Sequence, residues 1–219
     1  MDLQKKMIFK FIKRFFDFLF SFISIIFFFP ILIILVLISF LIQGSPIFFI
    51  HERLGLNAVP FKMIKFRSMK IGPSLSAKDD EKRLTSYGKF LRKTSLDELP
   101  VFLNVLKGDM SLVGPRPMPI KYLKRFNKKQ KIRMKIKPGL TGLAQVEGRN
   151  NLTWEKKFEL DVKYIERSSL YLDLKIILKT LLVVFSGSGI KPANSEIMPE
   201  FMGTKDNFNK DKIEKDNNN

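Results

Sequence analysis

FLFSFISIIFFFPILIILVLISFLI, residues 18–42, carries no charged residue and is almost wholly apolar. About 20 such residues are enough for a helix to span the hydrocarbon core of a bilayer. A cleaved signal peptide fits poorly, because its apolar core would be shorter and would be followed by a small-residue cleavage site. A helix buried in a soluble core is the other alternative, but few soluble domains bury so uniform a run. The stretch therefore predicts a membrane helix.

The flanks of this helix bear on how it lies in the membrane. Lys and Arg are favoured on the cytoplasmic side, and both flanks here are basic. Pro30, near the middle of the run, removes a helix hydrogen bond and kinks the axis. We therefore predict a re-entrant helix whose two ends return to the cytoplasmic face, and a straight span remains the alternative. The basic residues are Lys5, Lys6, Lys10, Lys13 and Arg14 before the run, and Arg53, Lys62, Lys65, Arg67 and Lys70 after it.

Composition narrows the class of partner. The chain of 219 residues has 39 Lys and Arg against 21 Asp and Glu, a net charge of +18. Such an excess predicts an anionic partner, either nucleic acid, anionic lipid or a phosphorylated substrate. Many of the 22 Phe residues lie in the first 50 positions, which favours a membrane surface over nucleic acid. The absence of cysteine excludes disulfides and thiolate metal sites.

The rest of the chain predicts an α/β class, a small and mostly helical catalytic domain with short strands. We divide the chain into an amphipathic start with the re-entrant helix (1–44), a cytoplasmic-face domain (45–202) and a polar, disordered tail (203–219). Apolar patterning and turn residues predict strands at 47–50 and 61–69. Helical spacing predicts helices at 95–106, 120–134, 154–167 and 171–185, the second strongly basic and the last two amphipathic.

Two adjacent carboxylates, Asp97 and Glu98, are the first candidates for chemistry. Neighbouring residues on a helix point about 100° apart, so the two cannot do the same job. One could attack a substrate while the other holds a metal. The structural alternative is a capping box, in which Ser95 and Glu98 satisfy the first amides of a helix.

Cations and glycines around this pair favour phosphate chemistry. Arg92 precedes the carboxylates, Arg116 lies in a Gly-Pro-Arg-Pro loop, and Arg149 lies in a glycine-rich segment. Arg binds phosphate oxygens through forked, charge-assisted bonds. Carboxylates beside such cations indicate phosphoryl transfer with a divalent cation, and a carboxylate can itself be the nucleophile. Each Arg alone could equally be a solvated surface charge.

Several other site classes are excluded or weak. His51 is the only histidine, so no histidine pair exists for a triad or zinc site, and we expect it to be structural. The P-loop and the dinucleotide-binding glycine motifs are both absent. The basic segment 121–137 could bind nucleic acid or lipid.

Seven blocks in order along the chain resemble the bacterial sugar transferases, also called monotopic phosphoglycosyl transferases. Together they are much more specific than any one alone. They are residues 61–69 (FKMIKFRSM), 95–100 (SLDELP), 104–117 (NVLKGDMSLVGPRP), 137–146 (KPGLTGLAQV), 148–150 (GRN), 157–162 (KFELDV) and 172–175 (LDLK).

The resemblance implies a fold, a place and a reaction. The fold is one re-entrant helix, interfacial amphipathic helices and a small α/β part at the cytoplasmic face of the bacterial inner membrane. Asp97 would attack the β-phosphate of a UDP-sugar and release UMP, and undecaprenyl phosphate would then take the phosphosugar from Asp97. Glu98 matches the Mg²⁺-binding Glu of the family. The positions expected to line the active site and hold phosphate or nucleotide are Lys65, Arg92, Arg116, Arg149 and Asp161.

One departure from the family and several open points remain. Relatives often have Ser-Pro at the helix break, whereas Phe29 precedes Pro30 here. The short chain is similar to minimal members that use a UDP-diacetamido-trideoxy sugar (bacillosamine type), with UDP-galactose, UDP-glucose and UDP-N-acetyl amino sugars as alternatives.

Expected partners are anionic lipid and downstream glycosyltransferases, without nucleic acid. The competing function is a non-enzymatic basic membrane adaptor for anionic lipid or nucleic acid, which would leave the carboxylate and arginine set idle.

Overall fold

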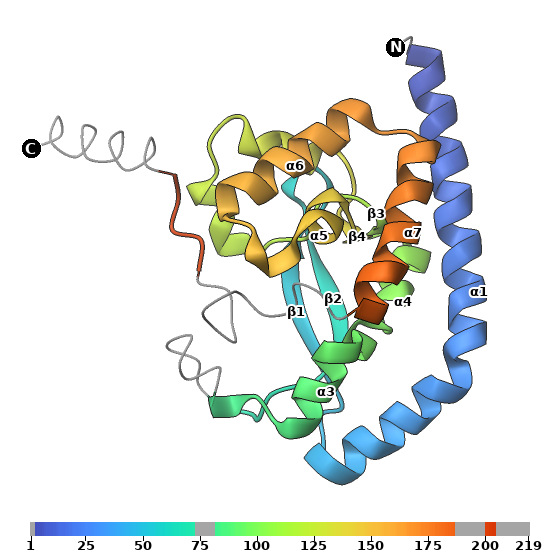
Figure 1. Ribbon diagram of the computed structural model, residues 1–219, viewed down its shortest axis with the longest axis vertical. Helices are drawn as coiled ribbons and strands as arrows, with labels where there is room; N and C mark the ends of the chain where they lie inside the picture. Colours follow the sequence, from blue (N-terminus) through green and yellow to red (C-terminus); the bar gives the residue numbers. More distant parts are fainter. Residues whose placement is uncertain (1–2, 73–81, 187–199, 205–219) are drawn as a thin grey trace, which may run out of the picture.

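The computed structural model describes residues 3–72, 82–186 and 200–204. The predicted tail at 203–219 lies almost wholly outside these residues. In Figure 1 a long N-terminal helix runs along one side of a small domain of short helices and short strands. The predicted class, mostly helical with short strands, is confirmed in this coarse form.

The long helix α1 spans Leu3–Gln43 and contains Pro30. Figure 1 shows its axis bending in the lower half of the view, as expected where a proline removes a backbone hydrogen bond. The helix is long and apolar enough to cross a membrane, and only 11% of its most apolar window is buried. Such exposure is the opposite of a helix in a soluble core, where the apolar residues would be covered.

The beginning of α1 is fixed to the domain by polar side chains. Arg14 donates from Nη1 to the carbonyl of Val105 at 2.6 Å and from Nη2 to that of Leu106 at 2.7 Å. These carbonyls lie in the last turn of α4 (Val101–Lys107), where the helix no longer supplies the amide four residues later. Asp17 is buried and accepts a hydrogen bond from the amide of Leu112 at 3.0 Å. The N-terminal half of α1 is therefore held against α4 and the strand that follows it.

The end of α1 is fixed to the same domain. Gln43 donates from Nε2 to the carbonyl of Arg67 at 2.8 Å, and Arg67 donates back to the carbonyl of Gln43. The hydroxyl groups of Ser39 and Tyr87 are 3.0 Å apart. Both ends of the apolar run thus contact one body of protein.

Two strands after α1 form an antiparallel hairpin, β1 (Phe48–Leu54) and β2 (Pro60–Phe66). The predicted strands at 47–50 and 61–69 are confirmed in existence, although β1 runs four residues further and β2 ends three earlier. Phe49 pairs with Lys65 in the register, so Lys65 lies near the open end of the hairpin.

A second, parallel pair of strands carries the proline loop. It consists of β3 (Ser111–Val113) and β4 (Gly139–Thr141). A Cβ atom on Gly139 would lie 2.1 Å from the amide nitrogen of Gly114, so only glycine permits this approach. The close pairing fixes where the 114–117 loop leaves the sheet.

Two of the predicted helices are confirmed and a third begins later than predicted. The predicted helix at 154–167 is confirmed as α6 (Trp154–Arg167), and 171–185 as α7 (Leu170–Ser186). The predicted helix at 95–106 begins later, as α4, behind a short 3₁₀ helix, η2 (Leu96–Glu98). The described residues also form α3 (Ser86–Thr94) and α5 (Leu143–Glu147).

The prediction of one basic helix at 120–134 is wrong. The segment forms two 3₁₀ helices, η3 (Ile120–Arg125) and η4 (Gln130–Lys135). Between them Asn127 and Gln130 exchange hydrogen bonds, each amide donating to the side-chain oxygen of the other at 3.0 and 2.8 Å. Side chains that bond nearby amides in this way compete with continuous helix.

Aromatic residues explain how these two short helices are held. Phe201 is 1% exposed and lies among Tyr122, Phe126, Trp154 and Phe158, with ring centroids 4.9 to 5.9 Å away. Its amide donates to the Tyr122 hydroxyl at 3.0 Å. The cluster joins η3, α6 and the described C-terminal residues into one unit.

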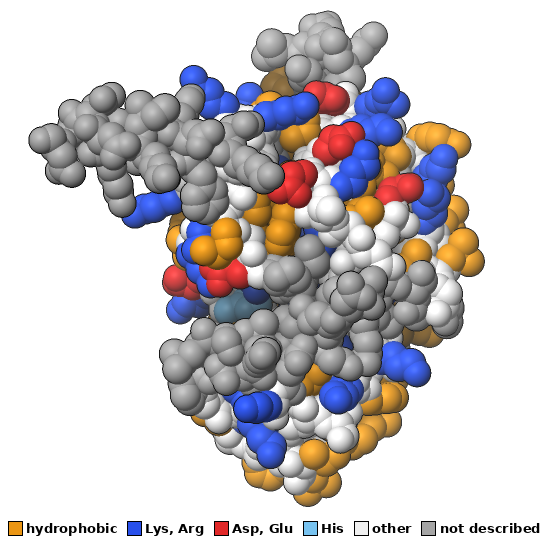
Figure 2. Space-filling view, turned by 60° about the vertical axis from the view of Figure 1, so that its left-hand side comes forward, with side chains coloured by type: hydrophobic (Ala, Val, Ile, Leu, Met, Phe, Trp, Pro, Cys, Tyr) orange, Lys and Arg blue, Asp and Glu red, His pale blue; other side chains and the backbone are white. Residues whose placement is uncertain are grey.

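Helix α7 has one face on the core and the other exposed. Ile176 is buried at 1% exposure, whereas an apolar stripe at helical spacing is open. Figure 2 shows hydrophobic side chains, in orange, along the right-hand and lower margins of the molecule. The exposed apolar residues of α7 are Leu170, Tyr171, Leu174, Leu178, Leu181 and Leu182.

Candidate functional site

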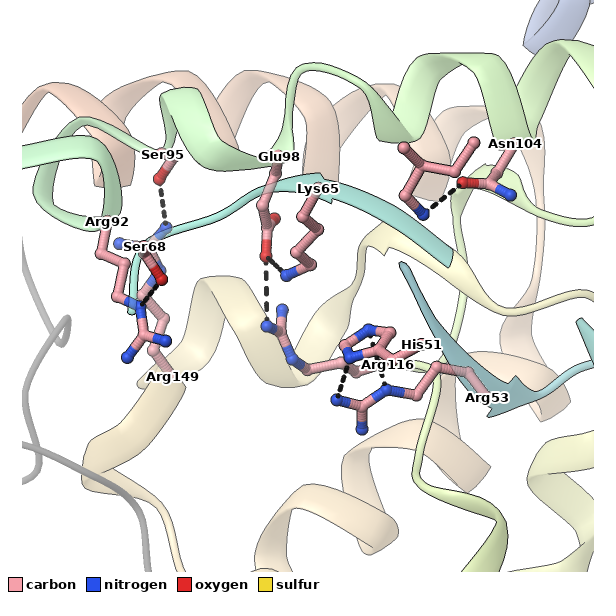
Figure 3. A network of polar contacts seen from close by, with 11 residues as sticks. His51, Arg53, Lys65, Ser68, Arg92, Ser95, Glu98, Asn104, Arg116 and Arg149 are labelled. Atoms are coloured by element: carbon pink, nitrogen blue, oxygen red, sulfur yellow. Dashed lines mark hydrogen bonds and ion pairs between the residues drawn. The ribbon is translucent and has the colours of Figure 1, made fainter. Parts of the chain in front are cut away.

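Glu98 on η2 is the centre of a charge network. Lys65 at the end of β2 places its Nζ 2.5 Å from Glu98 Oε1, and Arg116 places Nη2 3.2 Å from the same oxygen. Figure 3 shows the three side chains pointing toward one another from β2, η2 and the 114–117 loop. Three of the predicted site residues therefore meet although they lie up to 51 positions apart in the sequence (116 − 65).

The capping-box alternative for Ser95 and Glu98 is wrong. Ser95 is in the left-handed region, with φ 58°, and its side chain makes no cap hydrogen bond. Its hydroxyl instead accepts a bond from Arg149 Nη2 at 3.4 Å, while the Glu98 carboxylate faces Lys65 and Arg116. The carboxylates of η2 are thus turned toward cations and not toward helix amides.

The side chain of Asp97, next to Glu98, is buried. Its residue is 8% exposed, and in the part of the chain that the structure describes its carboxylate has no hydrogen bond or ion pair. Burial raises the pKa of Asp97 to about 6, against the opposing charge of Lys65, and the charge of Glu98 raises it further. A carboxylate with free lone pairs, close to cations, has the properties of a nucleophile.

The neighbouring carboxylate has the opposite electrostatics. Burial alone would raise the pKa of Glu98, but the charges and hydrogen bonds of Lys65 and Arg116 lower it to about 2. Glu98 is therefore ionised at every physiological pH. Adjacent acids with pKa values pushed apart indicate a division of roles.

Arg92 and Arg149 lie on one side of this pair, and each contacts a serine. Arg92, in the last turn of α3, donates from Nε to Ser68 Oγ at 3.0 Å. Helix α3 can come this close because position 88 is glycine, since a Cβ there would lie 1.9 Å from the Ser68 carbonyl oxygen. Arg149 lies on η5 (Arg149–Asn151) and contacts Ser95. Figure 3 shows both guanidinium groups on the side of the site near Ser68.

The structure places Asp161 apart from this network. It lies on α6 and forms an ion pair with Arg133, Nη2 to Oδ2 at 2.7 Å, with both side chains under 5% exposed. Among the described residues no hydrogen bond or ion pair connects it to Glu98. Its predicted contact with substrate stays a prediction.

Two polar residues of β1 at the site were not predicted to act there. Arg53 donates from Nε to His51 Nε2 at 3.1 Å, and Figure 3 places both beside Arg116. Burial, together with the charges of Arg53, Lys65 and Arg116, lowers the pKa of His51 to about 3, so its ring is neutral. Their alternation along a strand, which puts positions 51 and 53 on one face, was a signal that could have identified them.

The Glu98 carboxylate fits a magnesium ion whose other ligands would be water and substrate oxygens. The described residues contain no cluster of three or more His, Cys, Asp or Glu side chains. Mg²⁺ commonly uses only one or two carboxylates and completes its shell with water and substrate phosphates. Lys65 and Arg116 both contact Oε1 of Glu98, and Oε2 accepts no hydrogen bond from the described part of the chain.

The site as a whole can receive a phosphorylated anion. The charged groups around Asp97 and Glu98 include Lys65, Arg92, Arg116 and Arg149. Four cations against two carboxylates leave a net positive charge for phosphate oxygens, beside a carboxylate that can attack. This is the arrangement that phosphoryl transfer requires.

Comparisons with known proteins identify relatives of this chain. The family model described as bacterial sugar transferase matches residues 8–187. An uncharacterized sugar transferase, EpsL, of Bacillus subtilis is 48% identical over 165 residues, covering 74% of this chain and 82% of the relative. The exopolysaccharide production protein ExoY of Rhizobium meliloti is 33% identical over 196 residues, covering 81% and 87%.

A third relative is longer. A UDP-glucose:undecaprenyl-phosphate glucose-1-phosphate transferase of Klebsiella pneumoniae is 40% identical over 187 residues, covering 80% of this chain but 40% of the relative. The chain therefore spans most of EpsL and ExoY and about two-fifths of the Klebsiella enzyme. Since the family model matches well over half of its residues, this chain belongs to the bacterial sugar transferase family.

Proposed function

We propose that this protein transfers a sugar 1-phosphate from a UDP-sugar to undecaprenyl phosphate and releases UMP. The observation that carries the proposal is the buried Asp97 carboxylate, which has no hydrogen bond or ion pair to the described residues and lies beside a cation-bound Glu98. Relatives named as transferases of glucose 1-phosphate to undecaprenyl phosphate support the substrate classes. Other relatives are named for galactosyl transfer and exopolysaccharide production, which supports a first step of surface glycan synthesis.

The reaction proceeds in two displacements at one phosphorus atom. An Asp97 carboxylate oxygen attacks the β-phosphorus of the UDP-sugar, and the bond from that phosphorus to the bridging oxygen breaks. UMP leaves with the bonding electron pair on this oxygen. A phosphate oxygen of the acceptor then attacks the same phosphorus and displaces the carboxylate, which restores Asp97. Lys65, Arg92 and Arg116 offset the charge on the equatorial oxygens in both steps.

Glu98 is the residue that would hold Mg²⁺, through the oxygen that Lys65 and Arg116 leave free. When bound there, the ion supplies charge neutralisation for the diphosphate. The other oxygen of Glu98 orients Lys65 and Arg116, so this one carboxylate would hold the metal and also position two phosphate-binding cations.

The donor can be identified by a screen. The protein in detergent is incubated with undecaprenyl phosphate, Mg²⁺ and UDP-glucose, UDP-galactose, UDP-N-acetyl amino sugars or a UDP-diacetamido-trideoxy sugar, and UMP is measured. Release of UMP with one of them supports the transferase. Salt-sensitive binding to anionic vesicles without any UMP release supports the membrane adaptor instead.

We further propose that α1 is re-entrant and that the domain lies on the cytoplasmic face, where anionic lipid meets the basic flanks. The contacts of Arg14 and Asp17 at one end and of Ser39 and Gln43 at the other support it. A straight span would carry one of these ends across the bilayer and away from the domain.

Single cysteines in this cysteine-free chain test the topology. Lys10→Cys and Ser45→Cys are both exposed positions, and we expect neither to react with a membrane-impermeant maleimide added to intact cells. Both should react in inverted vesicles, which serves as the control for accessibility. Labelling of Lys10→Cys alone from outside the cell would establish the straight span.

The raised pKa of Asp97 predicts how the rate depends on pH. Attack requires the ionised carboxylate, so the rate should fall about tenfold per unit as the pH drops below about 6. Glu98, with a pKa of about 2, stays ionised over this range. The measurement is the initial rate of UMP release from pH 4.5 to 8.

Burial also raises the pKa of Asp161 to about 6. The fall in rate below about pH 6, the acid limb of the profile, must therefore be assigned to one of the two carboxylates. Asp161→Asn should lower the rate but keep the acid limb, since Asp97 is unchanged. Loss of the limb in this variant would assign it to Asp161.

A further inference from the structure

A second charge pair lies in the interior next to the site. Arg133 on η4 is 4% exposed and donates from Nη2 to Asp161 Oδ2 at 2.7 Å. The same nitrogen donates to the backbone carbonyl of Arg116 at 2.6 Å. One buried guanidinium thus connects α6 to the loop that carries Arg116.

The surroundings of Arg133 hold it in one place. Its guanidinium carbon lies 5.5 Å from the ring centroid of Phe126 and 5.0 Å from that of Phe158, within the range of cation–π contact. Both rings pack against Phe201. A buried charge persists only when it is paired and packed, and Asp161 supplies the pairing.

The Arg116 loop depends on such anchoring. Pro115 and Pro117 have no backbone N–H, so the residues on either side of Arg116 cannot donate hydrogen bonds. The Arg116 side chain is 46% exposed, so the core does not fix it. Its direction toward Glu98 follows from where its backbone is held, by Gly139 at the Pro115 carbonyl (2.9 Å) and by Arg133 at its own carbonyl.

We propose that Arg133, held by Asp161, is a positioning residue that sets Arg116 against Glu98 for the phosphoryl transfer. The inference rests on the proposed function for its kinetic consequence. It assigns Asp161 to the support of Arg133 and not to the substrate.

The key variant is Arg133→Lys. Its ammonium keeps the charge near Asp161, but the lysine side chain is shorter, so it cannot place a donor where Nη2 bonds both Asp161 Oδ2 and the Arg116 carbonyl. A small misplacement of a group that acts in the transition state lowers the rate strongly. We expect kcat and kcat/KM for UMP release to fall together by about 10- to 100-fold.

A double-mutant cycle with Arg116→Ala separates positioning from general structural damage. If Arg133 acts through Arg116, Arg133→Lys should change the rate of the Arg116→Ala protein by less than about twofold. If the two losses multiply, or if Arg133→Lys keeps the full rate, the proposal is overturned.

A matched control is Arg125→Lys on the neighbouring 3₁₀ helix. Arg125 also has an ion pair, to Glu200 at 2.6 Å, and a cation–π contact, with Tyr122 at 5.5 Å, but its side chain is 27% exposed and these contacts lie away from the Arg116 carbonyl that Arg133 bonds. Its rate should stay within about twofold of the unchanged protein. A loss as large as that of Arg133→Lys would also overturn the proposal.

Two further measurements keep the test decisive. If Arg133→Lys unfolds, the double variant Arg133→Met with Asp161→Leu removes both buried charges, and the same non-additivity with Arg116→Ala is expected. Amide exchange at Gly114, Gly139 and Leu54, whose amides bond the carbonyls of Thr141, Pro115 and Met118, should speed up in Arg133→Lys and not in Arg125→Lys. That readout needs no turnover. If the protein with its natural sequence releases no UMP, the proposed function is refuted. The exchange rates would still decide whether Arg133 positions the Arg116 loop.

Discussion

Asp97→Asn should lower the rate of UMP release by about 10⁴-fold or more, because an amide cannot attack phosphorus as a carboxylate does. Asn has nearly the same shape, so Lys65, Glu98 and Arg116 keep their network. Without acceptor, the unchanged protein incubated with donor should gain the mass of one phosphosugar on the peptide that contains Asp97. The Asn variant should gain none.

The control for this result is Glu159→Gln, the same carboxylate-to-amide change at an exposed position where the carboxylate pairs with Lys156. We expect it to leave both UMP release and adduct formation unchanged. Full turnover by Asp97→Asn would show that Asp97 is not the nucleophile. An adduct on another residue of the unchanged protein would move the chemistry elsewhere, even with the membrane helix in place.

The parts of the fold that were predicted correctly depend on local patterns. The apolar run of α1 and the apolar spacing of α6 and α7 are visible within one stretch of chain, so these helices could be predicted. The 120–134 segment has helical composition but not helical structure. Contacts with Phe201, far along the chain, and the reciprocal bonds of Asn127 and Gln130 decide its shape.

The candidate site shows the same division. The motifs predict that Lys65, Glu98 and Arg116 lie at one site, and the structure brings the three together, while their roles toward phosphate stay predictions. The conformation of Ser95 could not be predicted, because its left-handed backbone follows from the turn between α3 and η2. That turn removes the capping box which the local sequence favours.

The ion pair between Arg133 and Asp161 could not be predicted from the sequence. Arg133 is one of many basic residues in its segment, and nothing local distinguishes it from the exposed lysines beside it. Its partner Asp161 lies 28 positions later on α6. Only the packing of η4 on α6 shows that this arginine is buried, and therefore that the pair has a role different from a surface charge.

Glu98→Gln should have the second largest effect, a fall of about 10²- to 10³-fold in UMP release. The amide has no charge to hold Lys65 and Arg116 at one oxygen, and it is a weak ligand for Mg²⁺. The charge of Glu98 also raises the pKa of Asp97. Removing it should therefore move the acid limb of the pH profile below its position near pH 6. Initial rates over a series of Mg²⁺ concentrations and pH values measure all three effects.

The matched control is Glu147→Gln, whose carboxylate pairs with Lys179 on the surface at 2.9 Å. It should keep the rate, the response to Mg²⁺ and the acid limb. The shift of the limb is the most specific of the three effects, because it needs a charge next to the nucleophile and does not depend on whether the metal binds. If Glu98→Gln lost rate but kept the limb at its original pH, the titrating group would not be Asp97. The division of roles between the two adjacent carboxylates would then fail.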